Sequence, residues 1–256
     1  MLKLLRRFFA YFIDMMVILI IVQTITSIPF INRQINKYED VYNNYLENTN
    51  QYTSFRLDLV ESFDDKELTK KEYQELVKDN ANYEELLNKY YKDDKLSKKN
   101  YDKLLKEIDN TYMKEYKSIY YKLDKYSIVN NISYLVVTLL YFVGFNIITG
   151  GVTLGKKLAR LKIINNKDSN KKVSTISYLI RFIMLYQPIY YLVRLVGIKL
   201  LNIGNYYDIV NIVYSIHSYL EFMILALVIV RLDGRGLHDL ASGTKVVSVE
   251  LNGNEV

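Results

Sequence analysis

Four apolar stretches set the pattern of the chain, and polar segments of very unequal length separate them. The apolar stretches are residues 8–28, 127–149, 176–198 and 209–230. Each has about 20 residues, the length that an α-helix needs to cross the hydrocarbon core of a bilayer. The third stretch is the weakest, because polar residues and Pro188 interrupt it. The pattern predicts an all-α membrane protein with four transmembrane helices.

A long polar insert, residues 31–126, lies between the first two apolar stretches. It holds 18 Lys/Arg and 20 Asp/Glu and has no Pro and no Gly. The stretch LTKKEYQELVKDN (68–80) recurs as the similar LSKKNYDKLLKEI (96–108). Apolar residues at helical spacing predict two or three amphipathic helices in a hairpin or small bundle, and Thr69 with Glu72 predicts a capping box. Two interpretations of this insert stay open. It is either a solvated helical spacer or a recognition domain for an envelope partner.

The basic residues outside the insert indicate the orientation in the membrane. They lie before the first apolar stretch, in the loop 150–175 and in the tail after residue 230, whereas the loop 199–208 has Lys199 alone. The positive-inside rule therefore places both termini in the cytoplasm and makes the insert extracytoplasmic. The first stretch is too long for a signal peptide, and no small-residue cleavage site follows it. The expected domains are 1–30, 31–126 and 127–250.

Composition excludes several classes of function. The chain has no Cys and two His, so a disulfide framework and a zinc site are not expected. The basic excess lies beside apolar runs, which favours anionic lipid headgroups over nucleic acid as its partner. GGVTLGK (150–156) has P-loop spacing, but Lys157 follows where Ser or Thr is required. We expect no enzymatic activity, no catalytic residue and no cofactor, and instead a short helix with Leu154, Leu158 and Leu161 toward lipid.

Charged residues within the apolar stretches are candidate functional positions, because an unpaired charge in a bilayer costs a few kcal/mol or more. Asp14 lies about 9 Å inside the first span, and Arg7 lies two helical turns earlier on the same face. They are about 10 Å apart along the axis, which is too far for an ion pair. Each needs a partner from another segment, and Arg181 and Asp239 are the expected ones.

The tail RLDGRGLHDLASGTKVV (231–247) follows an apolar run directly and mixes acids with bases. Its glycines permit sharp turns, so we expect Asp239 to turn back toward Arg7 or Arg181 and to close a polar cluster. VVSV (246–249) is expected to pair with LKII (161–164) as a short strand. Whether the cluster locks the fold or gates a pathway stays open.

His217 and Glu221 form a second candidate site in the fourth apolar stretch. They are four residues apart and are therefore neighbours on one helix face. A histidine beside a carboxylate inside a membrane suits a proton relay. A purely structural pair is the alternative.

Four separated motifs, taken together, resemble the RDD family of bacterial membrane proteins. They are Arg-Phe-Phe-Ala followed by Ile-Asp in residues 7–14, GVTLGKKLARLKIIN (151–165), Arg181 near the start of the third span, and LHDLASGTKVV (237–247). The resemblance covers residues 1–30 and 127–250 and leaves the insert without an inherited role. The family is named for an arginine and two aspartates, which by motif position are Arg7, Asp14 and Asp239. It implies a multi-pass protein of the bacterial plasma membrane.

Two functions follow as hypotheses. Some RDD proteins are proposed to exchange Na⁺ or other monovalent cations for protons, which would make this chain a Na⁺/K⁺/H⁺ transporter or a subunit of one. The carriers would then be Asp14, His217 and Glu221, and the counter-charges would be Arg7, Arg181 and Asp239. Four spans are few for a complete transporter, so a homo-oligomer is expected. The alternative is a membrane anchor that presents residues 31–126 to an envelope partner.

Overall fold

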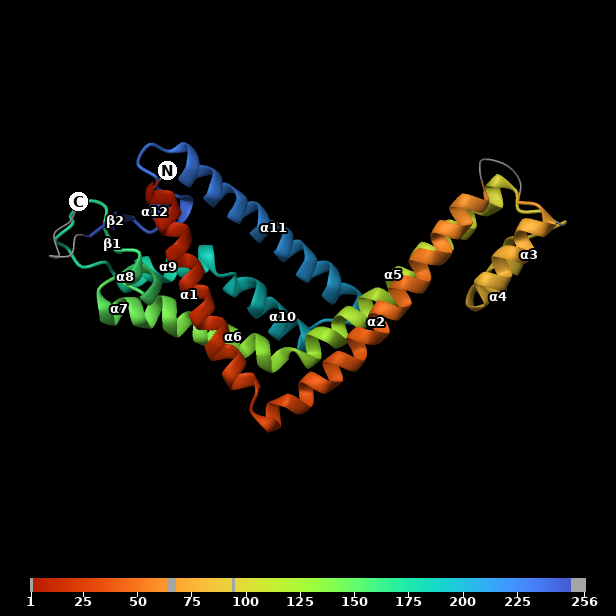
Figure 1. Cartoon of the computed structure of the whole chain (residues 1–256), viewed down its shortest axis with the longest axis horizontal. Helices are drawn as coiled ribbons and strands as arrows, with labels where there is room; N and C mark the ends of the chain where they lie inside the picture. Colours follow the sequence, from red (N-terminus) through yellow and green to blue (C-terminus); the bar gives the residue numbers. More distant parts are fainter. Residues whose placement is uncertain (1, 64–67, 94, 250–256) are drawn as a thin grey trace. The chain divides into compact units, whose positions relative to one another are not determined.

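The computed structural model describes residues 2–63, 68–93 and 95–249, and Figure 1 traces them in chain order. The chain divides into two compact units. One unit combines residues 1–35 with residues 124–256 and holds the apolar helices; the other comprises residues 36–123, most of the expected insert. Residues 64–67 and 94 of that insert, and residue 250 of the expected last domain, lie outside the described part.

The first unit is built from apolar helices. They are α1 (Leu2–Thr26), α6 (Ile128–Leu139), the π-helical turn η2 (Leu140–Phe145), α7 (Asn146–Thr149), α8 (Leu154–Leu158), α9 (Thr175–Leu185), α10 (Pro188–Leu200), α11 (Ile203–Val230) and α12 (Leu237–Ala241). In the described part of the chain, three continuous stretches are long and apolar enough to cross a bilayer, namely Leu4–Thr26, Ile128–Thr149 and Ile203–Val230. Large apolar side chains such as Phe8, Leu140 and Phe222 point outward from them. Outward apolar surface on this scale is typical of a membrane-embedded protein.

The third predicted span is not one helix, so the prediction of a single transmembrane helix over residues 176–198 was wrong. α9 and α10 pass the same test of length and composition only as a pair, and they are bent by 70° at a short break. The physical reason is Pro188, which has no N–H to donate and disfavours helical geometry in the residue before it. Gln187 takes a left-handed conformation with φ of 55°, which ends α9 and redirects the chain. Within the described residues, the membrane unit therefore has three continuous candidate spans, and the bent α9–α10 pair forms either a broken span or a re-entrant loop.

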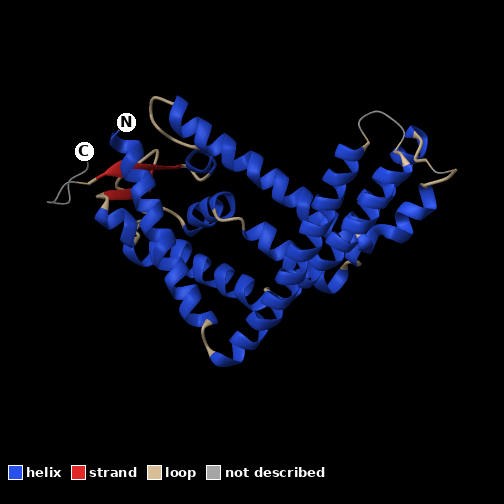
Figure 2. Ribbon diagram, turned by 45° about the vertical axis from the view of Figure 1, so that its right-hand side comes forward, coloured by secondary structure: helices blue, strands red, loops and turns tan. Residues whose placement is uncertain are grey.

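A small antiparallel sheet closes the first unit, beside the start of α1 (Figure 2). β1 (Leu161–Asn165) pairs with β2 (Thr244–Ser248), and Ile163 lies opposite Val246. This confirms the predicted pairing and means that the fold is mostly rather than entirely helical. Leu161 packs with Ala10 in a buried cluster, so the prediction that it faces lipid was wrong.

The main core of the first unit joins α1, the α6–η2 stretch and α9. Its buried residues include Ile18, Val22, Phe142, Phe182 and Tyr186. The rings of Phe142 and Tyr186 stack with centroids 3.7 Å apart. This packing fixes the orientation of α1 and α9, which carry Asp14 and Arg181, and of η2, which carries Tyr141, and so it positions the site.

The second unit has a hydrophobic core of its own. It contains most of α2 (Pro29–Ser62), α3 (Lys70–Asp79), the short 3₁₀ turn η1 (Ala81–Tyr83), α4 (Glu84–Tyr90) and most of α5 (Lys98–Tyr126). The two sequence copies begin at equivalent positions, Leu68 and Leu96, whose backbones exchange two hydrogen bonds of 3.4 Å. Both leucines are buried. The predicted capping box is confirmed, since Thr69 and Glu72 bond reciprocally at the start of α3.

Candidate functional site

Asp14 on α1 is buried and accepts hydrogen bonds from three groups on other segments. The Tyr141 hydroxyl donates to Oδ1 at 2.7 Å, the Thr153 hydroxyl to Oδ2 at 2.6 Å, and the Gly155 N–H to Oδ1 at 2.7 Å. The Lys156 Nζ lies 3.9 Å from Oδ2. All four of these groups are donors or cations, so the polar surroundings of Asp14 suit an ionised carboxylate.

The Gly-x-Thr-x-Gly-Lys segment of residues 151–156 supplies three of the groups that contact Asp14. Gly151 has φ of +95°, and a Cβ there would lie 2.5 Å from the Ile163 carbonyl oxygen. A Cβ on Gly155 would collide with the carbonyl of Ala10. The two glycines therefore let the loop approach α1 and β1 closely enough for its donors to reach the carboxylate.

A second cluster gathers around Asp239, which is fully buried on α12. Arg181 on α9 donates to Oδ1 of Asp239, and its same nitrogen donates to the Thr244 hydroxyl at 2.7 Å. The Arg7 guanidinium lies 3.8 Å from Oδ2, and the Gly236 N–H donates to Oδ2 at 3.3 Å. The expected return of Asp239 toward Arg7 and Arg181 is thus what the structure shows.

Arg7 also ties the tail to α1 through backbone carbonyls. Its guanidinium donates to the carbonyl oxygens of Gly234 and Val246, the latter at 3.1 Å. The tail is therefore fixed by one arginine at a turn and at a strand. Contrary to expectation, Asp14 does not pair with Arg181; its partners are Tyr141 on η2 and the residues 153–156 that follow α7. Sequence reasoning had assigned that loop to the membrane surface and so missed Thr153, Gly155 and Lys156 as partners.

Two titratable groups at this end of the unit are shifted by their surroundings. Burial lowers the pKa of Lys156 to about 8, although the Asp14 carboxylate opposes the shift. Burial, reinforced by Arg181, lowers the pKa of His238 to about 3, so this imidazole is neutral at pH 7. The Nδ1 atom of His238 is buried and has no hydrogen-bond partner within the described residues.

His217 and Glu221 lie together on α11, as their spacing predicts. The His217 Nε2 is 3.4 Å from the Glu221 Oε1, an ion-pair distance at which the geometry does not make a hydrogen bond. The Gln187 side chain, at the break between α9 and α10, donates to the same Glu221 oxygen at 2.9 Å. His217 is buried, whereas 46% of the Glu221 side chain is exposed. Through Glu221, the pair contacts Gln187 at the break between α9 and α10.

A third polar cluster, which sequence reasoning did not identify, joins Asp124 to the membrane helices. The Arg194 Nε donates to Asp124 at 2.9 Å and the Tyr206 hydroxyl at 2.6 Å. Arg194 is one of the polar residues that interrupt the third apolar stretch. Its charge inside an apolar stretch was the signal that a buried acid must lie nearby.

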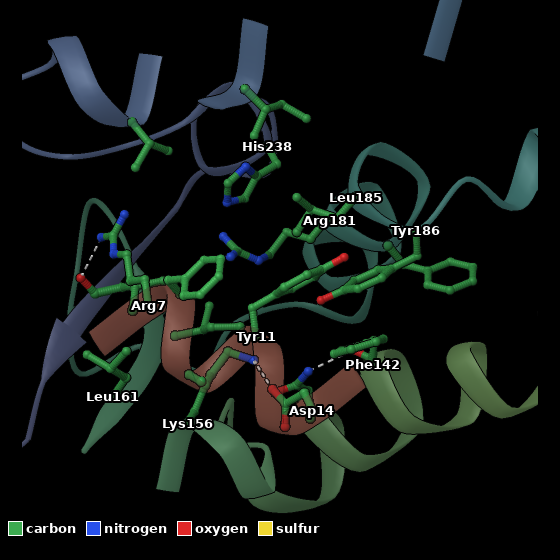
Figure 3. A pocket seen from close by; sticks show the side chains of 18 of the residues that line it. Arg7, Tyr11, Asp14, Phe142, Lys156, Leu161, Arg181, Leu185, Tyr186 and His238 are labelled. Atoms are coloured by element: carbon green, nitrogen blue, oxygen red, sulfur yellow. Dashed lines mark hydrogen bonds and ion pairs between the residues drawn. The ribbon is translucent and has the colours of Figure 1, made fainter. Parts of the chain in front are cut away.

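A cavity of about 440 Å³ adjoins the first two clusters (Figure 3). Arg7, Lys156, Arg181 and His238 lie on one side of it, and the rings of Tyr11, Tyr186 and Phe142 lie on the other. Asp14 and Glu221 also line it. Among the described residues, no group of three or more His, Asp or Glu side chains is placed to hold a metal ion.

Residues 119–243 match the model of the RDD family. The family resemblance is therefore confirmed over a range that contains Arg181, His217, Glu221 and Asp239. Arg7 and Asp14 lie before that range, and their place in the site rests on the contacts described above. No curated protein and no solved structure matches the chain.

Proposed function

We propose, on the premise that residues 119–243 belong to an RDD-family membrane domain, that the chain is a monovalent cation/proton transporter or a subunit of one. The observation that carries this proposal is the meeting of three polar side chains at the broken span. Gln187 sits at the break, and it contacts Glu221, whose neighbour on α11 is the buried His217. We assign His217 and Glu221 as the proton- or cation-binding pair.

A broken helix inside a membrane supports such a site for a physical reason. Backbone groups freed at a break have no water in the hydrocarbon core, so irregular backbone there is tolerated only inside protein or beside a polar cavity. Discontinuous helices of this kind form the ion sites of many secondary transporters. Glu221 lies nine residues before Val230, the last residue of α11, which corresponds to about 14 Å along the axis. A carboxylate at that depth needs a function or a partner.

The two aspartates have a different role in this proposal. Asp14 accepts three hydrogen bonds from other segments, and Asp239 accepts one from Arg181 on α9 and one from the N–H of Gly236 at the start of its own helix. A carrier must release its ion or proton, whereas breaking such a network leaves several donors unsatisfied. We therefore assign Asp14, Arg7, Arg181 and Asp239 to holding the helices around the transport pair.

The test is cation/proton exchange in proteoliposomes loaded with a pH-sensitive dye, with Na⁺, K⁺ or Li⁺ added outside. Glu221→Gln should abolish the cation-driven pH change, because glutamine can still accept the bond from Gln187 but cannot ionise. Asp208→Asn, an exposed acid on the same helix, is the matched control and should retain exchange. Exchange retained by a folded Glu221→Gln protein would rule out this pair as the carrier.

A second candidate function is a membrane anchor that presents residues 31–126 to an envelope partner. The separate hydrophobic core of the second unit favours it, since a mere spacer needs no core. This function requires the insert to be extracytoplasmic, as the positive-inside rule predicts. If it is correct, deleting residues 36–122 should abolish cross-linking to envelope components in cells, whereas Glu221→Gln should not. Four spans per chain also lead us to propose a homo-oligomer for either function.

A further inference from the structure

We propose that the cavity beside the arginine–aspartate cluster binds a single-chain anionic lipid, with its headgroup at Lys156 and its acyl chain along the aromatic wall. This inference goes beyond ion transport, because it concerns a ligand site in the same domain. It rests on the volume of the cavity, on the separation of charged from apolar lining residues, and on the balance of charges at one end.

The cavity has the size and the lining of a small-molecule site. Its volume of about 440 Å³ lies within the range of roughly 300–1,000 Å³ that such sites have. Most of the lining is apolar and comes from α1, α9 and α11. Tyr11, Phe142, Tyr178, Phe182 and Tyr186 supply aromatic surface. A lining of this kind suits an acyl chain better than a hydrated inorganic ion.

The charged groups gather at one end of the cavity and are unequal in number. Arg7, Lys156 and Arg181 contribute three positive charges, against two from the buried carboxylates Asp14 and Asp239. His238, on the same side, is neutral at pH 7. One positive charge is therefore in excess within a buried cluster, and a bound anion would balance it.

Glu221 also lines the cavity and does not remove this excess. It lies about 14 Å along α11 from the end that leads to the tail, and it pairs with Gln187 and His217. The charges that act on Lys156 are instead Asp14, Arg181 and Asp239. The anion site is thus at the Lys156 end and is separate from the proposed transport pair.

Two buried polar atoms of cavity-lining residues add an independent observation. The Nδ1 atom of His238 and the Oδ1 atom of Asn146 have no hydrogen-bond partner within the described residues. His238 is 8% exposed and Asn146 is 2% exposed. Buried polar groups are nearly always paired in native proteins. A protonated Nδ1 of His238 can donate to a carboxylate headgroup, whereas Oδ1 of Asn146 accepts hydrogen bonds and does not contribute to binding the anion.

The probe is radiolabelled oleate, measured by equilibrium binding to the full chain in phosphatidylcholine nanodiscs, with empty nanodiscs subtracted. Oleyl alcohol has the same chain without the charge, and inorganic phosphate has charge without a chain. Lys156→Gln should weaken oleate binding about tenfold or more, because it removes a charge-assisted contact, whereas Lys156→Arg should retain it. Leu225 lines the cavity, so the larger side chain in Leu225→Trp should reduce its volume and also weaken oleate binding. Ile229 lies on the same helix with its side chain exposed, so Ile229→Trp should leave binding unchanged.

A pH series separates a direct role of Lys156 from a structural one. Its neighbours are Asp14 on α1, Arg181 on α9, and His238 and Asp239 on α12. Oleate binding to the wild type should weaken between pH 7 and pH 9, as Lys156 with its pKa of about 8 loses its proton. Lys156→Arg should remove this dependence, since arginine stays charged.

Three results would overturn the proposal. They are equal binding of oleyl alcohol and oleate, wild-type affinity in a folded Lys156→Gln protein, and displacement of oleate by inorganic phosphate, which would assign the cluster to a soluble anion. None of these measurements involves ion exchange. Failure here would therefore leave the assignment of His217 and Glu221 untouched, and the reverse also holds.

Discussion

Asp239→Asn should strongly destabilise the membrane unit, because it removes one member of a buried charged cluster. Oδ1 of Asp239 accepts a hydrogen bond from the Arg181 guanidinium. Oδ2 accepts one from the Gly236 N–H at 3.3 Å and lies 3.8 Å from the Arg7 guanidinium. An asparagine must direct its NH₂ group at one of these donors, whichever way the amide is turned. Two arginines would then lack their shared carboxylate, while Asp239 itself is fully buried.

The expected magnitude follows from measurements on buried ion pairs. Removing one partner of such a pair costs about 3–5 kcal/mol. For a protein of this size, 1 kcal/mol corresponds to roughly 2–4 °C in Tm, so Tm should fall by about 6–20 °C. Burial by itself would raise the pKa of Asp239, but Arg181 and other cations lower it below the ordinary value. The contribution is therefore complete at pH 7 and is lost only as the pH falls below about 4.

The assay is the loss of monodisperse protein on heating, followed by size-exclusion chromatography in detergent. Asp233→Asn is the matched control, because this acid lies in the same tail but pairs with Arg231 and Arg235 at the exposed surface, and it should leave Tm nearly unchanged. Combining Asp239→Asn with Arg181→Gln should cost less than the sum of the single changes. A Tm for Asp239→Asn equal to that of the Asp233→Asn control would refute the idea of a structural lock.

Three further predictions concern other parts of the chain. The stability of the wild type should fall below pH 6.5 by up to about 1.4 kcal/mol per pH unit, since the folded state holds the pKa of His238 at about 3, and His238→Gln should flatten this slope in a pH series of Tm. Gly155→Ala should lower Tm or abolish folding, because its Cβ would meet the carbonyl of Ala10, and an unchanged Tm would contradict the close packing of loop and helix. Phe55→Ala should destabilise the second unit by about 3–5 kcal/mol in denaturant unfolding of the full chain, whereas Leu57→Ala at the exposed surface should have little effect.

The positions that could be predicted from the sequence are those where local pattern alone sets the outcome. Apolar runs of about 20 residues gave the spans, because the thickness of a bilayer fixes that length. The spacing of His217 and Glu221 placed them together, since residues four apart share a helix face. The capping box at Thr69 and Glu72 has the same local origin.

The partners of the buried charges were decided only by the tertiary structure. The sequence required a partner for Asp14 and offered Arg181 as the nearest basic candidate, whereas the fold supplies Thr153, Gly155 and Lys156. Such contacts join segments more than 130 residues apart, so no spacing along the chain encodes them. Their presence depends on how closely two backbones approach, and that depends on packing.

The break in the third span shows the same division between sequence and tertiary structure. Pro188 marks where a helix is hard to continue, but many proline-containing helices only kink. Only the tertiary structure shows the bend of 70° and the hydrogen bond from Gln187 at the break to Glu221 on α11. The sequence by itself thus determined the membrane segments and their charged residues, and packing between distant segments determined which of those residues meet.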